Sequence, residues 1–277
     1  MPILKLAIMN SNTLAFIGGG NMASAIIGGL IASGRPASSV LVVEPFEAQR
    51  QKLAAQGVRC LAVADASLAE AALVLWAVKP QLFKEAAAPC AAHVAGALQV
   101  SVMAGIRSET IVAATGAERV VRSMPNTPAL IGKGIAGLYG RAAATAADRA
   151  LVEEVMAPTG AVLWVDREED LDAVTALSGS GPAYVFYVIE AMMQAAREMG
   201  LSEAQGRQLA LATFAGATEL AQRSDDPVEL LRERVTSKGG TTYAALTSLE
   251  ASGVKASFVA AIKAAQRRAE ELGREST

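Results

Sequence analysis

The 277-residue sequence has one histidine, two cysteines and few aromatic residues, and its charges almost cancel. A single histidine excludes a histidine-rich metal site and argues against a Ser-His-Asp hydrolase. Cys60 and Cys90 are too few for a disulfide framework or a cysteine metal cluster, which is typical of a protein of the reducing cytoplasm. With 25 basic and 27 acidic side chains, the net charge of −2 offers no positive surface for nucleic acid or an anionic membrane.

Long hydrophobic runs are also missing. The uncharged segment from Leu6 to Gly34 is interrupted at residues 11–13 and 18–21, so no block of about 18 apolar residues is left to cross a membrane. What the chain does have is an apolar fraction of 52%, rich in alanine and glycine. A chain of this length and composition is expected to form about two domains with a large buried core.

The first part of the chain alternates short β-branched runs with alanine-rich segments of helical length. This alternation predicts an α/β domain with a mostly parallel sheet and helices on both faces, including helices at Asn21–Ser33, Glu47–Gln56 and Ala146–Met156. The predicted strands are Leu14–Gly18, Val40–Val43, Val58–Leu61, Leu73–Val78, Leu98–Val102, Arg119–Ser123, Gly134–Tyr139 and Ala161–Val165.

After Asp166 the strand pattern stops and only helical segments follow. Glycine-, proline- and serine-containing breaks separate them at residues 178–182, 224–227, 237–240 and 252–253. The sequence therefore predicts two domains, an α/β domain at residues 1–166 and an all-helical domain at residues 167–277.

The first predicted strand runs directly into a GxGxxA pattern at residues 18–23. Glycines at its first and third positions allow a tight turn and a close approach of the backbone to a pyrophosphate, and the alanine lets helix and strand pack closely. The start of the following helix adds free N–H groups and a positive dipole end. Alone the pattern could be a generic glycine turn. In this strand–turn–helix context it predicts a Rossmann-like domain that binds a dinucleotide phosphate through Gly18, Gly20, Asn21, Met22 and Ala23.

Glu44 ends the second predicted strand, where a dinucleotide-binding domain places the acid that accepts hydrogen bonds from the adenosine ribose. A carboxylate there favours a free 2′-hydroxyl and repels a 2′-phosphate, so Glu44 favours NADH over NADPH. Arg50 or Lys52, one or two helical turns on, could offset this by reaching the phosphate. The alternative interpretation of Glu44 is a solvated loop charge.

Two more segments follow strand ends. In Ala77-Val78-Lys79-Pro80 we favour Lys79 as a cation near the cofactor over a catalytic acid, and Pro80 fits the first position of a helix. Met124-Pro125-Asn126-Thr127-Pro128 is expected to be a rigid loop with polar groups at the same rim of the sheet. The alternative there is a plain turn.

The helical part contains two further glycine-rich segments. Residues 178–182 read as an ordinary turn between helices, with Pro182 beginning the next one. At Thr236–Thr242, glycines and hydroxyls precede a helix predicted at Tyr243–Leu249, which indicates a nest for an anion such as a carboxylate. A helix cap rich in serine and threonine is the alternative.

His93 and the acidic run Asp166–Asp170 are predicted to have no part in the chemistry. His93 is expected to be packed or on the surface. The acidic run is expected to be a solvated helix start at the domain boundary, because it lacks suitably spaced partners for a metal. No metal site is predicted.

Together these segments resemble the pyrroline-5-carboxylate reductases, enzymes of the last step of proline biosynthesis. The resemblance runs from Leu14 to about Leu272, and MPNTP, SGSGPAY and GGTT together are far more specific than GxGxxA. The matching segments are FIGGGNMASAIIGGL (16–30), AVKP (77–80), VRSMPNTPAL (121–130), LSGSGPAYVF (177–186) and SKGGTT (237–242). The resemblance implies a helical C-terminal domain that intertwines with a partner's, homodimers that often build decamers, and an active site at the dimer interface.

The resemblance also implies roles for single residues. The glycine loop would bind the pyrophosphate, and Ala77, Val78, Lys79, Pro80 and Asn126 would flank the nicotinamide side. Thr175, just before the LSGSG segment, would face the imine nitrogen as the catalytic residue. The substrate carboxylate would be held by Ser237, Gly240, Thr241 and Thr242.

The sequence departs from the family at two of these positions. Lys238 stands where many members carry proline, which adds a cation to the carboxylate loop. Glu44 stands where members that prefer NADPH tend to have serine, asparagine or a basic residue. The cofactor is therefore expected to be NADPH or NADH, with NADH favoured.

Reduction of a C=N bond needs a hydride on carbon and a proton on nitrogen. An imine is basic enough to arrive protonated, so the protein must mainly orient and desolvate it, and no histidine or cysteine acid is required. The β-hydroxyacid dehydrogenases instead use GxGxxxKxxN, and alignment on Gly179 and Gly181 puts Val185 and Val188 at its lysine and asparagine. Two alternatives stay open: a reductase of another cyclic imine on the same scaffold, and a non-catalytic dinucleotide sensor.

Overall fold

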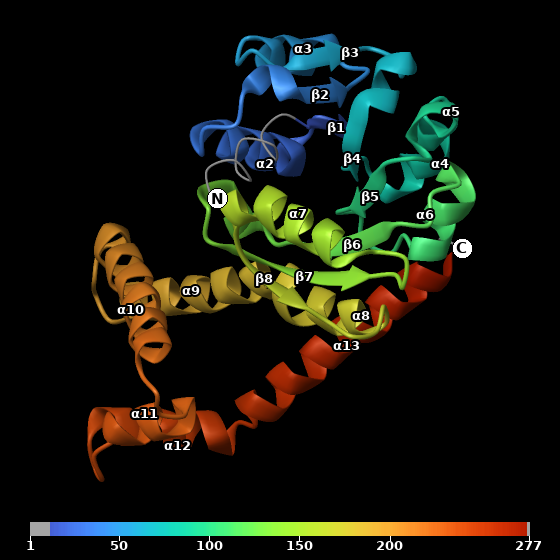
Figure 1. Cartoon of the computed structure of the whole chain (residues 1–277). Helices are drawn as coiled ribbons and strands as arrows, with labels where there is room; N and C mark the ends of the chain where they lie inside the picture. Colours follow the sequence, from blue (N-terminus) through green and yellow to red (C-terminus); the bar gives the residue numbers. More distant parts are fainter. Residues whose placement is uncertain (1–11, 276–277) are drawn as a thin grey trace. The chain divides into compact units, whose positions relative to one another are not determined.

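A computed structural model describes residues 12–275. The chain forms two compact units (Figure 1): the sheet unit, which extends to Ser180 and includes residues from Ala265 onwards, and the helical unit, Gly181–Ala264. The functional domain boundary expected at residue 166 stays a prediction. None of the helices in the described part combines the length and hydropathy needed to cross a bilayer.

The sheet unit is built on eight strands in the order β3-β2-β1-β4-β5-β6-β7-β8. Neighbouring strands pair in parallel except β6 and β7, which are antiparallel. The strands are β1 Thr13–Ile17, β2 Val40–Val43, β3 Arg59–Leu61, β4 Ala71–Trp76, β5 Leu98–Ser101, β6 Val120–Met124, β7 Gly134–Gly140 and β8 Gly160–Trp164. Each predicted strand is present with ends shifted by at most a residue or two, and the mostly parallel α/β class is confirmed.

Helices cover both faces of this sheet, as predicted (Figure 1). One face is covered by α2 Asn21–Ala32, α3 Glu47–Ala54 and α7 Ala146–Met156. The other is covered by α4 Phe83–Ala87, α5 Ala91–Val94 and α6 Ser108–Thr115. The short turn η3 Pro80–Leu82 leads from β4 to α4, η4 Thr127–Ile131 connects β6 to β7, and η5 Ala157–Thr159 leads from α7 to β8. Helix α8 Asp170–Val174 follows β8.

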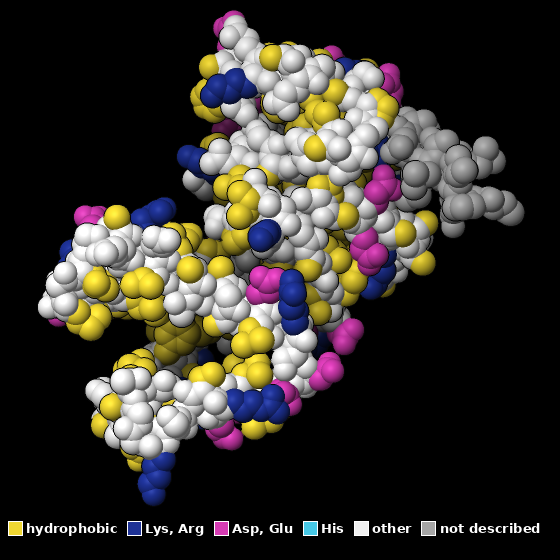
Figure 2. Space-filling model, turned by 90° about the vertical axis from the view of Figure 1, so that its left-hand side faces the viewer, with side chains coloured by type: hydrophobic (Ala, Val, Ile, Leu, Met, Phe, Trp, Pro, Cys, Tyr) yellow, Lys and Arg dark blue, Asp and Glu magenta, His cyan; other side chains and the backbone are white. Residues whose placement is uncertain are grey.

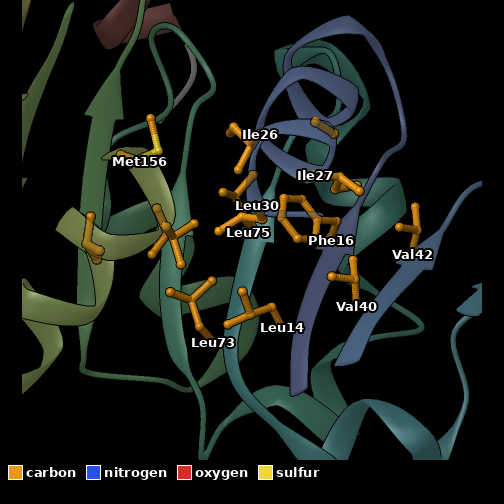
Figure 3. Close-up of a cluster of buried hydrophobic side chains, with 14 of the residues drawn as sticks. Leu14, Phe16, Ile26, Ile27, Leu30, Val40, Val42, Leu73, Leu75 and Met156 are labelled. Atoms are coloured by element: carbon orange, nitrogen blue, oxygen red, sulfur yellow. The ribbon is translucent and has the colours of Figure 1, made fainter. Parts of the chain in front are cut away.

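The core follows from the alternation of side chains along strands that are buried on both faces. In β1, Ala15 and Ile17 point to the α4–α6 side, whereas the neighbouring residues point to α2. Figure 3 shows this second layer, in which β1 and α2 meet through Leu14, Phe16, Ile26, Ile27 and Leu30. Each of these side chains is at most 3% exposed, and each such burial stabilises the fold by about 1.5–3 kcal/mol.

The helical unit contains α9 Gly181–Glu198, α10 Glu203–Arg223, α11 Val228–Arg234, α12 Thr241–Ala251 and the first part of α13 Val254–Glu275. The predicted breaks at residues 224–227 and 252–253 separate these helices as expected. The reason α10 starts where it does is a capping box, in which Ser202 and Gln205 exchange hydrogen bonds.

The helical unit buries little of its own apolar surface. Its buried hydrophobic residues are Ile189, Ala196 and Ala210. Large apolar side chains remain exposed along its helices, among them Phe186, Tyr187, Met199, Leu209 and Leu220. Figure 2 shows hydrophobic side chains on the surface of these helices. Exposed apolar surface on this scale marks an interaction site.

Candidate active site

The glycine loop between β1 and α2 has the geometry that the sequence predicts. Gly18 has a φ of +94°, and a Cβ there would lie 2.8 Å from the Ala77 carbonyl oxygen, so only glycine fits. A Cβ on Gly20, by contrast, would meet nothing within 4 Å. The space beside Gly20 is therefore open to a ligand.

The start of α2 leaves its first backbone N–H groups free for that ligand. Gly20 precedes the helix without a side-chain cap, and the first intrahelical bond runs from Ser24 N to Gly20 O at 2.8 Å. The N–H groups of Asn21, Met22 and Ala23 therefore have no intrahelical acceptor. No acidic side chain lies in this turn. The arrangement suits an anionic phosphate.

Gly19, which the GxGxxA pattern leaves unspecified, is closely surrounded, unlike Gly20. Its N–H donates to Glu44 Oε2 at 2.8 Å, and its carbonyl accepts from Ser24 Oγ at 3.0 Å and from Gln49 Nε2. A Cβ on Gly19 would lie 2.8 Å from Leu53 Cδ1. Sequence reasoning missed this residue, although the run of three glycines was a usable signal.

Glu44 is not the solvated loop charge of the alternative interpretation, because it is only 6% exposed. Its Oε2 accepts from Gly19 N and its Oε1 accepts from Phe46 N at 2.9 Å. Each carboxylate oxygen keeps one lone pair for a further donor such as a ribose hydroxyl. Arg50, a candidate for a 2′-phosphate, instead donates to the Glu44 and Pro45 carbonyl oxygens at 2.8 and 2.6 Å, and Lys52 is exposed.

The AVKP segment lies beside the glycine loop. Ala77 N donates to Ile17 O at 2.8 Å and so continues the β1–β4 pairing past the strand ends. Lys79 is exposed and immediately precedes η3, and Pro80 is the first residue of that turn, as predicted. Helix α2 also packs against η4, which places the loop after β6 next to the same helix.

Asn126, in the loop after β6, is not part of a plain turn. Its Oδ1 accepts from Ile135 N at 3.0 Å and its Nδ2 donates to Ser178 Oγ at 3.3 Å. The side chain thus connects the loop to the start of β7 and to the segment that follows Thr175. One Nδ2 hydrogen remains for a ligand.

Thr175 begins a single π-helical turn, Thr175–Gly179, rather than preceding an ordinary break between helices. Ser180 N donates to Thr175 O at 2.8 Å, and the chain passes directly into α9 with Pro182 in its first turn. The break expected at residues 178–182 is therefore confined to a bend at Ser180, and the next helix begins at Gly181, one residue before the predicted Pro182. The extra residue of a π turn is accommodated because Gly179 lacks a Cβ, which would lie 2.6 Å from Met124 Cε. Such turns occur frequently at functional sites.

The hydroxyl of Thr175 has a defined orientation. Oγ1 lies 2.7 Å from Leu171 O, and because a carbonyl oxygen cannot donate, the hydroxyl is the donor. Its oxygen lone pairs remain available to accept from another group. Thr175 itself is half-buried.

The loop predicted to hold the substrate carboxylate lies in the helical unit. Ser237 O accepts from Gly240 N at 3.0 Å in a turn where Gly239 has a φ of +76°, and a Cβ on Gly240 would lie 2.7 Å from Ser237 Oγ. Helix α12 begins at Thr241, two residues before the predicted start, because Gly240 O already accepts from Ala244 N. No side chain caps this helix, so the Ser/Thr cap is not formed and the hydroxyls of Thr241 and Thr242 are left for other partners.

The expectation that the acidic run at residues 166–170 is solvated was wrong for Glu168. Its Oε1 accepts from Ser108 N at 2.7 Å and from Arg122 Nη1 at 2.9 Å, and its Oε2 accepts from Ser108 Oγ. Burial raises the pKa of the Glu168 carboxyl, but the Ser108 hydroxyl and amide and Arg122 outweigh it and lower the pKa below its usual value. The carboxylate caps α6 from a distant part of the chain, which no local pattern reveals.

Glu168→Gln is expected to lower the free energy of unfolding by about 1.5–3 kcal/mol at pH 7, as for a lost hydrogen bond to a charged group. Because the pKa of Glu168 is lowered in the folded state, its contribution is complete above the unfolded pKa of about 4.3 and disappears as pH falls through the folded pKa. Urea unfolding of both proteins between pH 3 and 8 measures this. Glu70→Gln, which removes an exposed ion pair with Arg59, is the control and should change little. A difference that persists undiminished at the lowest pH would contradict the prediction.

The predicted site residues thus fall into two groups. The sheet unit brings together the glycine loop, Glu44 and AVKP, and joins Asn126 to the turn of Thr175. Ser237, Gly240, Thr241 and Thr242 lie in the helical unit. Within residues 12–275, no three His, Cys, Asp or Glu side chains cluster as metal ligands would.

The chain is similar over most of its length to known proteins. Residues 168–272 match the family model for pyrroline-5-carboxylate reductase dimerisation, and residues 13–105 match that for coenzyme F420-dependent NADP oxidoreductase. A pyrroline-5-carboxylate reductase of Pseudomonas aeruginosa is 43% identical over 95% of this chain and 98% of its own. The chain belongs to the pyrroline-5-carboxylate reductase family.

Solved structures agree with this family. That of a pyrroline-5-carboxylate reductase from Coxiella burnetii superposes with a TM-score of 0.89 at 34% identity, covering 95% of this chain and 98% of the other. That of Plasmodium falciparum pyrroline carboxylate reductase with NADP bound has a TM-score of 0.85 at 27% identity, with 95% and 99% covered. The predicted family, its Rossmann-like N-terminal and helical C-terminal architecture and its NAD(P)H-dependent oxidoreductase class are confirmed. The dimerisation model likewise supports self-association.

Proposed function

We propose that the chain reduces 1-pyrroline-5-carboxylate to proline with hydride from NAD(P)H, that Thr175 faces the imine nitrogen, and that the start of α12 takes a substrate carboxylate. The observation that carries the proposal is the Thr175 turn. A hydroxyl of fixed orientation lies on a π turn that Asn126 joins to the rim where the parallel strands end. That rim is where open α/β sheets bind nicotinamide cofactors.

The described residues fit the cofactor. The open space at Gly20 and the uncapped N–H groups of α2 suit the pyrophosphate, and Glu44 has lone pairs left for the ribose. Ala77, Val78, Lys79, Pro80 and Asn126 would contact the nicotinamide side. The nicotinamide, when bound, supplies the hydride, and the protein orients the cofactor and the substrate toward each other.

The orientation of the Thr175 hydroxyl favours a protonated substrate. Since Oγ1–H donates to Leu171 O, the oxygen is left as an acceptor and can receive the N–H of an iminium ion. Protonated nitrogen makes the ring carbon a better hydride acceptor, so the residue would orient the substrate without acting as a strong acid.

The opposite polar end of the substrate is a carboxylate, which α12 can bind. The backbone N–H groups of Thr241 and Thr242 lie in the uncapped first turn, and the hydroxyls of Ser237, Thr241 and Thr242 are close to it in the chain. A helix N-terminus favours an anion both through these donors and through the helix dipole.

Turnover by the purified chain tests the reaction. Reduction of 1-pyrroline-5-carboxylate with NADH and NADPH, followed by loss of absorbance of the reduced cofactor, is the expected result. A ring-size panel of cyclic imines distinguishes the alternative imine reductase, which would prefer another member of the panel. Cofactor binding without turnover of any imine would favour the non-catalytic sensor.

We also propose that NADH is the preferred cofactor, by about 5- to 30-fold in kcat/KM. At about 4 Å and an effective dielectric near 20, repulsion between a 2′-phosphate and Glu44 is at most about 4 kcal/mol, and solvent reduces it to roughly 1–2 kcal/mol. Arg50 does not offset this, because the Glu44 and Pro45 carbonyls already hold it.

Glu44→Ser is expected to remove most of that preference. The same change releases Gly19 and lowers the rate with both cofactors, so the ratio of their kcat/KM values is the quantity to measure. Glu47→Ser, which removes an exposed carboxylate three residues away, should leave the ratio unchanged. A natural protein that prefers NADPH, or a ratio unmoved in Glu44→Ser, would contradict the prediction.

For the assembly we propose a homodimer as the functional unit, built through the apolar surface of the helical unit. The family resemblance extends this to a decamer, which sedimentation of the purified chain would test. The two free cysteines, one of them buried, fit a reducing cytoplasmic setting.

A further inference from the structure

Two ion pairs of low exposure hold α8, the short helix that leads into Thr175. Before the helix, Glu168 Oε1 lies 2.9 Å from Arg122 Nη1. Within the helix, Asp172 Oδ2 lies 2.6 Å from Arg107 Nη2. All four side chains are between 6% and 16% exposed. The two arginines come from other elements: Arg122 lies on β6, and Arg107 immediately precedes α6.

Helix α8 depends on such contacts because it is short. It has five residues, and helices of this length are not stable without tertiary support. Its Leu171 carbonyl accepts the Thr175 hydroxyl, so the position of α8 decides where that hydroxyl points. Asp172 lies one residue beyond Leu171 and connects this turn to Arg107.

The packing around the Thr175 turn leaves little room for a shift. A Cβ on Gly137 of β7 would lie 2.7 Å from Val174 Cγ1, and one on Gly179 would lie 2.6 Å from Met124 Cε. The Arg107 guanidinium passes close to Gly273 near the end of α13, where a Cβ would lie 2.6 Å from Nη2, and it is held by Asp172. A change at either ion pair therefore alters the direction of the turn rather than being absorbed by empty space.

Removing one partner of such a pair is destabilising because it leaves a buried charge unpaired, but the intact pair adds little stability over apolar residues. Burying two charges costs desolvation that their attraction often only balances, and apolar residues of similar volume can serve as well. A directed, charge-assisted hydrogen bond also fixes the relative orientation of the two groups that it joins. Here the two pairs hold the backbone on either side of Leu171, and the Leu171 carbonyl orients the Thr175 hydroxyl.

We infer that Arg107–Asp172 and Arg122–Glu168 are positioning pairs for the reaction, which fix the turn of Thr175 relative to β6 and its following loop. Arg122 lies two residues before Met124, so one strand carries both an anchor for α8 and the loop of Asn126. The inference rests on the proposed role of Thr175.

Asp172→Asn tests the inference, because it keeps the shape of the side chain and removes its charge. We expect kcat for 1-pyrroline-5-carboxylate to fall about 10-fold, since displacement of a reacting group by about 1 Å costs up to about 100-fold. KM for the cofactor should stay within about 2-fold. Asp148→Asn is the matched control. Asp148 lies on α7, which carries no residue of the site, and its 2.8 Å ion pair is with Arg119, just before β6, so kcat should be unchanged.

A double-mutant cycle distinguishes positioning from general destabilisation. If Asp172 acts through Thr175, Asp172→Asn should not lower kcat further, within about 2-fold, in a Thr175→Val background. The same factor in both backgrounds, or an unchanged kcat in Asp172→Asn, overturns the inference. Where Asp172→Asn does not fold, Arg107→Lys, which keeps the charge but not the planar fork, is read in the same cycle. A normal kcat in Thr175→Val alone removes the proposed role of that residue and the inference with it.

Discussion

Thr175→Val is expected to lower kcat for 1-pyrroline-5-carboxylate by about 100-fold or more. The change keeps the side-chain volume and removes the oxygen that would accept from the substrate nitrogen, so the substrate loses its orientation toward the hydride. The melting temperature should change little, because one intrahelical hydrogen bond is worth about 1 kcal/mol. Steady-state kinetics at saturating cofactor measures the effect.

Two variants serve as controls for Thr175→Val. Thr175→Ser restores a hydroxyl and should recover most of kcat. Thr115→Val removes the equivalent bond from Thr115 Oγ1 to Ile111 O on α6 and should leave kcat unchanged. A near-normal kcat in Thr175→Val would show that Thr175 is a packing residue.

Thr242→Ala is expected to raise KM for 1-pyrroline-5-carboxylate by roughly 10- to 150-fold and to leave the cofactor KM nearly unchanged. A lost hydrogen bond to a charged group is worth about 1.5–3 kcal/mol, which corresponds to that range. Thr242 lies in the uncapped first turn of α12, so its hydroxyl is not needed to cap the helix. Initial rates over a range of substrate concentrations measure the change.

The same helix offers a control for Thr242→Ala. Thr247 lies further along α12, and its hydroxyl donates to Tyr243 O. Thr247→Ala removes a hydroxyl from α12 without touching its first turn, so KM should stay constant. A KM that is unchanged in Thr242→Ala as well would remove the loop from the substrate site.

The predicted elements succeeded where local chemistry decides the conformation. Gly18 needs a positive φ, Pro80 fits a helix start, and the β-branched run Val40–Val43 is a strand buried on both faces. Each of these features depends on a few residues that are neighbours in the sequence, so the sequence pattern alone is enough to predict it. The start of α12 was missed by two residues because a backbone bond from Ala244 N to Gly240 O, and no side-chain cap, sets it.

The failures concern residues whose partners are distant in the chain. Glu168 was expected to be solvated, yet Ser108 and Arg122 hold it from 60 and 46 residues away. Gly19 occupies an unspecified position of its motif, yet Glu44 and Leu53 confine it. Periodicity and propensity contain no information on such pairs, because the pairs form only when separate elements pack together.

The sequence by itself determined the α/β class, the dinucleotide loop and the family, since each depends on motifs and periods that local sterics impose. Only the tertiary structure decided how Thr175 is presented. A π turn at Thr175–Gly179 precedes the expected break, and Gly179 of this turn packs against Met124 of β6. The direction of the Thr175 hydroxyl follows from Leu171, and the position of Leu171 from α8 and the arginines that hold it. The local motif thus identified Thr175 in the sequence, whereas contacts between distant segments decided how its hydroxyl is oriented.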